Sequence, residues 1–101
     1  MGASLTHEKF ASHLKTQFAV LVDTEHGVDL TLSEVSELKL SPRQEQFAIV
    51  FRGPLDLFLG QGMRHFQHEK MGQFDLFLVP IGQDDKGFYY EAVFNRTRST
   101  T

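Results

Sequence analysis

Histidine is the first residue type in this sequence that suggests chemistry, because imidazole binds metals and transfers protons near neutral pH. Five histidines occur among the 101 residues. His65 and His68 are three positions apart, and on a β-strand an odd offset puts two side chains on opposite faces. His7 and His13 are six positions apart on an expected helix, about 240° around its axis, so they do not converge either. The spacing favours solvated or turn histidines over a metal site, and we expect no metal.

Acidic residues suggest two further possibilities, a calcium loop and a general base. Asp84 and Asp85 lie between Gly82 and Gly87, but the alternating ligands and the final bidentate glutamate of an EF-hand loop are missing. Asp and Gly in such a stretch serve turn geometry instead. Glu91 is a lone acid in an apolar segment, where it would act as a base or ion-pair partner. The simpler interpretation is a solvent-facing position on a strand.

The sequence lacks the patterns of nucleophilic catalysis and phosphate binding. No serine stands in a G-x-S-x-G elbow, and no glycine run precedes a helix. The absence of cysteine excludes disulfides, thiol nucleophiles and thiolate zinc sites. Arg52 follows a phenylalanine and precedes Gly-Pro, which is more typical of a surface arginine than of an anion clamp. We therefore expect no enzymatic activity and no cofactor.

Composition limits the domain organisation and the partners. A chain of 101 residues is one domain, here 1–101, and its polar end at 96–101 is expected to fray. The net charge of −3 comes from interspersed acids and bases, which argues against nucleic acid as a partner. No apolar run is long enough to span a bilayer, and the N-terminus does not resemble a signal peptide. We expect no membrane partner and a cytoplasmic location.

The elements that position these side chains are mostly β-strands. Leu5, Phe10 and Leu14 are spaced for one stripe of a helix over residues 7–15, with Thr6 as the N-cap. A loss of alternation after Leu32 predicts a β-bulge near residues 33–34. Residues 55–59 fit either a short extended piece or one helical turn over a barrel mouth. Alternating or apolar segments predict six strands, at 18–22, 28–33, 46–52, 63–68, 73–81 and 88–94.

Six strands in meander order, with one bulge and no crossover helix, define the expected fold class. It is mainly β: a six-stranded antiparallel small barrel or roll with one short N-terminal helix. Closure of the sheet would also remove exposed strand edges, which such apolar strands could not safely present to solvent.

Two of the expected strands are apolar on both faces. Residues 47–51 read FAIVF and residues 76–79 read LFLV, whereas a half-exposed strand alternates apolar with polar residues. If the alternate members point into the core, an apolar set points outward: Val50, Phe77, Val79, Tyr89 and Val93. Exposed patches of this kind mark interaction sites, so these five residues are the predicted partner-binding residues. In the alternative interpretation, the N-terminal helix covers them through Phe10 and Leu14.

Several motifs lie in the second half of the chain: FRGP at 51–54, Gln61-Gly62, FLVPIG at 77–82, Asp84, and YEAVFN at 90–95. Together with Leu5, Thr6 and Phe10 at the start, they resemble an uncharacterised bacterial family of domains of unknown function. Met63-Arg64 departs from the Thr-aromatic pair of that family. Its members occur near genes for phage-tail-like collar proteins, so the resemblance implies a role in assembly.

These observations suggest three functions, which we give from the most to the least favoured by the sequence. The first is a non-enzymatic module that binds a protein partner or forms a homo-oligomer, as a structural or accessory component of a phage-tail-like assembly. The second is a small barrel that binds an apolar ligand, although ten phenylalanines would fill a narrow six-stranded interior. An enzyme comes third, because the sequence contains no recognisable pair of nucleophile and base.

Overall fold

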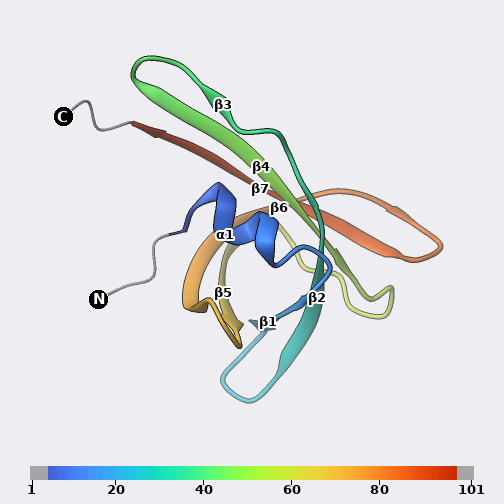
Figure 1. Cartoon of the computed structure of the whole chain (residues 1–101). Coiled ribbons are helices and arrows are strands. Elements are labelled where there is room, and N and C mark those ends of the chain that lie inside the picture. The colour runs from blue at the N-terminus through green and yellow to red at the C-terminus, as the bar shows by residue number, and fades with distance from the viewer. Residues whose placement is uncertain (1–4, 98–101) are drawn as a thin grey trace.

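The computed structural model describes residues 5–97, which form a closed β-barrel with one short helix (Figure 1). Within this range the elements are α1 His7–Ser12, β1 Gln17–Leu21, β2 Gly27–Val35, β3 Lys39–Leu40, β4 Gln44–Gly53, β5 Gly62–His68, β6 Gly72–Asp84 and β7 Gly87–Thr97. Six of these strands make up the barrel wall, while β3 adds a two-residue extension beside the start of β4. The predicted six-stranded antiparallel barrel with a short N-terminal helix is therefore confirmed.

The order of the strands differs from the expected meander. β4 pairs with β2 and β7, and β5 pairs with β1 and β6, so the connection from β4 to β5 crosses between non-neighbouring strands. This connection covers residues 54–61, far longer than the two-residue turn of a tight hairpin. Its length allows the chain to pass across one end of the barrel before β5 begins.

Two bulges bend the long strands. The pairing of β2 with β4 shifts register between Leu32 and Glu34, as the broken alternation predicted. A second shift lies between Pro80 and Gly82 on β6, beside a proline that has no amide to donate to a ladder. Such shifts increase the local twist and help a small sheet to close on itself.

Phenylalanine rings fill the barrel interior. The rings of Phe18, Phe51 and Phe66 are fully buried, with centroids 5.0–6.5 Å apart. The fully buried aliphatic side chains around them alternate along their strands, and they are Val20, Leu30, Leu32, Ile49 and Leu78. Period-two burial on β1, β2 and β4 therefore produces one continuous aromatic core.

Helix α1 closes one end of the barrel, which we call the helix end. The ladder between β6 and β7 begins at Val79 and Glu91, and earlier residues of β6 pair only with β5. Phe10 of α1 fills the resulting gap and is fully buried, and its ring contacts those of Phe18, Phe47, Phe74 and Phe94. In Figure 1, α1 lies between the β4–β7 pair and β5.

The helix is shorter than the sequence predicted. The Thr6 hydroxyl accepts a hydrogen bond from the Lys9 amide at 3.1 Å, which confirms Thr6 as the N-cap. The helix ends at Ser12, and Lys15 takes a left-handed conformation with φ of 71°. Its amide then donates to the Leu32 carbonyl at 2.8 Å, so pairing with β2 starts where the expected helix would still continue.

Residues 54–61 close the opposite end, which we call the loop end. Leu59 is buried there, and its amide donates to the Tyr90 hydroxyl at 2.9 Å. Phe58 packs edge-on against Phe88 with ring centroids 5.1 Å apart, although more than half of Phe58 stays exposed. The segment is a turn followed by irregular chain, so the extended and helical alternatives for residues 55–59 are both replaced by a packed loop.

The C-terminal strand is longer than expected. β7 continues through Thr97, so Arg96 and Thr97, expected in the frayed tail, belong to the sheet. The Arg96 guanidinium forms an ion pair with Glu45 at 3.0 Å, hydrogen-bonds the Leu5 carbonyl, and lies 5.2 Å from the Phe94 ring centroid. These contacts explain the ordered strand end; the remaining tail, 98–101, lies outside the described residues.

Candidate functional site

The predicted partner-binding residues lie on three adjacent strands, β4, β7 and β6. We call this set, Val50, Phe77, Val79, Tyr89 and Val93, the outer wall. Val50 and Val79 flank Glu91 of β7 on either side. Val93 pairs with Ala48, and Tyr89 pairs with Arg52. The pairings therefore gather Val50, Val79, Tyr89 and Val93 around Glu91, while Phe77 lies two residues before Val79 on the part of β6 that pairs with β5.

Exposure differs strongly within the outer wall. Val93 is 67% exposed and Phe77 is 47% exposed, whereas Val50, Val79 and Tyr89 are half-buried. Met63 of β5 pairs directly with Phe77 and is 63% exposed, so it extends the apolar surface. Sequence reasoning missed Met63. The available signal was the period-two pattern of β5, in which Met63 shares a face with outward His65 and Phe66 lies on the buried face.

Helix α1 does not cover the outer wall. Phe10 is buried inside the barrel, where its ring contacts those of Phe47 and Phe94. Leu14 is 40% exposed. The interpretation in which Phe10 and Leu14 cover these side chains is therefore wrong. The physical reason is the gap between β6 and β7, which gives the helix a larger aromatic surface to bury.

Tyr89 differs from the rest of the outer wall because its hydroxyl already has a partner. It donates to Asp84 Oδ2 at 2.8 Å, and this hydrogen bond raises the pKa of Tyr89. Asp84 Oδ1 accepts from the Lys86 and Gly87 amides at 2.8 and 3.2 Å, and the Lys86 bond is the main reason that the pKa of Asp84 is lowered. Asp84 thus serves turn geometry, as predicted, and Tyr89 braces the same hairpin.

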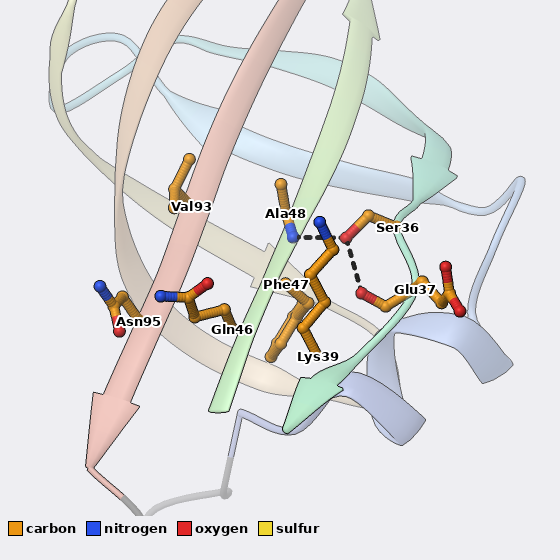
Figure 2. Close-up of a pocket in the computed structure, with 8 residues that line it drawn as sticks. All are labelled: Ser36, Glu37, Lys39, Gln46, Phe47, Ala48, Val93 and Asn95. Carbon is orange, nitrogen blue, oxygen red and sulfur yellow. Dashed lines mark hydrogen bonds between the residues drawn. The ribbon is translucent and has the colours of Figure 1, made fainter. Parts of the chain in front are cut away.

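A groove of about 370 Å³ adjoins Val93 (Figure 2). Strands β4 and β7 form its floor, and the segment from Ser36 to Lys39 forms its rim. The Ala48 amide donates to the Ser36 hydroxyl at 2.8 Å, which fixes that rim against the strand. Its lining residues are Ser36, Glu37, Lys39, Gln46, Phe47, Ala48, Val93 and Asn95.

The groove combines a small apolar floor with polar edges. Gln46 and Asn95 form a cross-strand pair, next to the pair of Ala48 and Val93. Carboxamides both donate and accept hydrogen bonds, so this edge can satisfy polar groups of a bound protein surface. The groove therefore extends the outer wall with hydrogen-bonding groups.

The two histidines of β5 lie in different environments. His65 points outward and lies 2.7 Å from Asp75 Oδ1, while His68 packs on Phe18 with ring centroids 4.2 Å apart. The two therefore lie on opposite sides of β5, as their odd spacing predicted. His68 also approaches His13, with ring centroids 4.7 Å apart, a contact that sequence reasoning missed. The two positions are far apart in sequence, and only the folded chain brings them together.

A polar hollow of about 460 Å³ lies beside His13 and His68, at the helix end. It is lined by His13, Thr16, Gln17, Ala19, Asp29, Gln67, His68, Glu69 and Lys70. Over residues 5–97, no group of three or more histidine, aspartate or glutamate side chains is arranged to hold a metal ion. In the same range no helix has the length and apolar character needed to cross a membrane.

Comparison with known proteins identifies a family. Residues 5–94 match the DUF6916 model, a domain of unknown function, and the chain belongs to this family. The resemblance to an uncharacterised domain family is thereby confirmed. No curated protein and no solved structure matches the chain. The family assignment accounts for nearly the whole barrel but names no activity.

Proposed function

We propose that this chain is a non-enzymatic β-barrel module that acts through protein–protein contact at the outer wall. The observation that carries the proposal is the exposure of Val93 on β7 and of Phe77 on the neighbouring strand β6. Covering the exposed part of an apolar side chain is favourable by about 25 cal/mol per Å² of area removed from water, before the cost of association. A partner that covers both residues and Met63 would therefore gain several such contributions.

Two further features support contact over ligand storage or catalysis. Aromatic rings in mutual contact fill the barrel interior, where an apolar ligand would have to bind. The groove next to Val93 instead opens on the outside and offers carboxamides at its edge. We propose an assembly role, as a structural or accessory component of a phage-tail-like particle, on the resemblance of the sequence motifs alone.

Substitution of Phe77 tests the proposal. Phe77→Asp places a charge on the outer wall without opening the core, so the chain should remain folded but lose association. Leu55→Asp is the matched control, because Leu55 is 46% exposed but lies in the loop end. Light scattering across a dilution series would measure the mass of each variant.

The expected result is a concentration-dependent mass for the wild type and for Leu55→Asp, and a constant monomer mass for Phe77→Asp. A wild type that is monomeric at every concentration excludes self-association and leaves a different protein as the partner. Equal association of both variants would remove Phe77 from the contact surface. Unfolding of Phe77→Asp would show that Phe77 belongs to the core.

A further inference from the structure

Three hairpin turns of the barrel use the same side-chain device. In each, one side-chain atom accepts hydrogen bonds from the backbone amides two and three residues further on. Asp23 does this in the β1–β2 turn, and Asp84 does it in the β6–β7 turn. His68 does it in the β5–β6 turn, where Nδ1 accepts from Lys70 at 3.0 Å and from Met71 at 3.1 Å.

The exchange of aspartate for histidine changes how the turn responds to protons. A carboxylate oxygen keeps lone pairs available even after protonation, and it is ionised at all but acid pH. An imidazole nitrogen has one lone pair, which a proton removes entirely. When Nδ1 of His68 is protonated, its N–H points at the N–H groups of Lys70 and Met71. Both hydrogen bonds must then break, because no acceptor remains.

The other ring nitrogen connects this turn to the segment that follows α1. Because Nδ1 accepts two amide protons, the neutral ring must carry its own proton on Nε2. Nε2 lies 3.0 Å from the Thr16 hydroxyl oxygen, which in turn donates to the His13 carbonyl at 2.6 Å. A single neutral tautomer of His68 therefore satisfies the turn on one side and the end of the helix segment on the other.

We propose that His68 is a proton-sensitive latch of the helix end: its neutral imidazole holds the β5–β6 turn against the segment after α1, and protonation of Nδ1 releases the turn while Nε2–H still donates to Thr16. The same turn carries Met71, which is buried in the core. Release of the turn therefore loosens the position of Met71 in the core, while the loop end keeps its contacts.

The charged groups around the ring support this assignment. Burial against Phe18 and the nearby His13 lower the pKa of His68, and burial is the larger cause. On its own turn, Glu69 raises the pKa and Lys70 lowers it. Asp29 of β2 lines the same hollow. The net direction is downward, so the folded chain resists protonation of this ring.

This direction gives the sign of the pH effect. Histidine in an unfolded chain titrates near pH 6.5, above the lowered pKa of folded His68. The unfolded or locally open chain therefore binds the proton first as the pH falls. The contribution of His68 is complete above about pH 6.5 and is lost progressively as the pH falls towards the folded pKa.

Amide hydrogen exchange on the wild-type chain tests the latch directly, with NMR detection at about pH 7.5 and about pH 5. Protection factors of Lys70 and Met71 should fall by about tenfold for each pH unit between the two pKa values of His68. The amides of His26 and Gly87, in the aspartate turns, provide the internal control and should keep their protection. Equal behaviour of all three turns would overturn the proposal.

Two further measurements decide the role of the ring. The nitrogen shifts of His68 at the higher pH should identify Nδ1 as the unprotonated atom, and the opposite tautomer contradicts the proposal. His68→Asn keeps an acceptor on the same side-chain atom position but does not titrate, so protection of Lys70 should become independent of pH. His65→Asn, three positions earlier on the same strand, should retain the wild-type dependence. Should His68→Asn not fold, the wild-type exchange and tautomer still give the answer.

Discussion

The two ends of the barrel are closed by different means. At the helix end a single ring, Phe10, enters a gap lined by four other phenylalanines. At the loop end an irregular segment is held by two hydrogen bonds, from the Leu59 amide to the Tyr90 hydroxyl and from the Arg64 guanidinium to the Gly60 carbonyl. The helix end therefore relies mainly on buried apolar area, whereas the loop end also relies on hydrogen bonds and on close backbone packing. This comparison predicts how each end fails.

The largest effect is expected at the helix end, with Phe10→Ala. Removal of a buried phenylalanine costs about 3–5 kcal/mol, through lost transfer free energy and the cavity that remains. The α1 segment has few other apolar residues to hold it, so its detachment should accompany the loss. Urea unfolding monitored by circular dichroism would measure the change.

Leu14→Ala is the control for Phe10→Ala, because Leu14 follows the same helix but is 40% exposed. Its cost should stay within about 0.5 kcal/mol, the usual range for surface substitutions. Similar losses for the two variants would mean that α1 is not anchored by Phe10, and the distinction between the two ends would disappear.

A smaller but substantial effect is expected at the loop end, with Gly87→Ala. A Cβ at this position would collide with the Gly53 carbonyl oxygen and would lie 2.8 Å from Arg52 Cγ. Because the first neighbour is backbone, the β4–β7 ladder must shift, at a cost of about 1–3 kcal/mol. Thermal unfolding would show a lower midpoint.

Gly60 supplies the control at the same end, since a Cβ there meets nothing within 4 Å. Gly60→Ala should leave the stability unchanged or raise it slightly, because alanine restricts the unfolded chain. If Gly87→Ala is equally harmless, the close approach of the two strands does not contribute to closure of the loop end.

The strands were predictable from the sequence because their burial alternates locally. The patterns around Phe18, Leu30 and Ile49 survive intact in β1, β2 and β4. The bulge after Leu32 was predictable for the same reason, since a break in a period-two pattern is visible without any partner strand.

The strand order and the ends were not predictable in the same way. Pairing of β1 with β5 joins segments that are distant in sequence, and no local pattern records such a choice. The length of residues 54–61 was the available signal against a meander. The position of Phe10 also depends on a gap that exists only after β6 and β7 diverge.

The candidate site likewise contains features that a local sequence pattern predicts and features that only the folded chain creates. Alternation alone selected Val93 and Phe77, which the structure leaves exposed. The approach of His13 to His68 required the folded chain. The turn role of His68 is nevertheless recognisable by comparison with Asp84. Each residue ends a strand and stands a few positions before the glycine that begins the next strand.

The smallest of the three effects is expected for Tyr90→Phe, which removes one of the two hydrogen bonds that hold the loop-end segment. The ring stays buried, but the Leu59 amide loses its acceptor, and the loss should be close to the usual net contribution of one hydrogen bond, about 0.5–1.5 kcal/mol. Tyr89→Phe removes an exposed hydroxyl on the neighbouring residue and should cost less, because water can replace its bond to Asp84. Exchange of the Leu59 amide would locate the loss: faster exchange there, with Phe10 and its neighbours unaffected, means that the two ends open independently. Equal loosening of both ends would instead make the barrel a single cooperative unit, in which the aromatic interior transmits every local change.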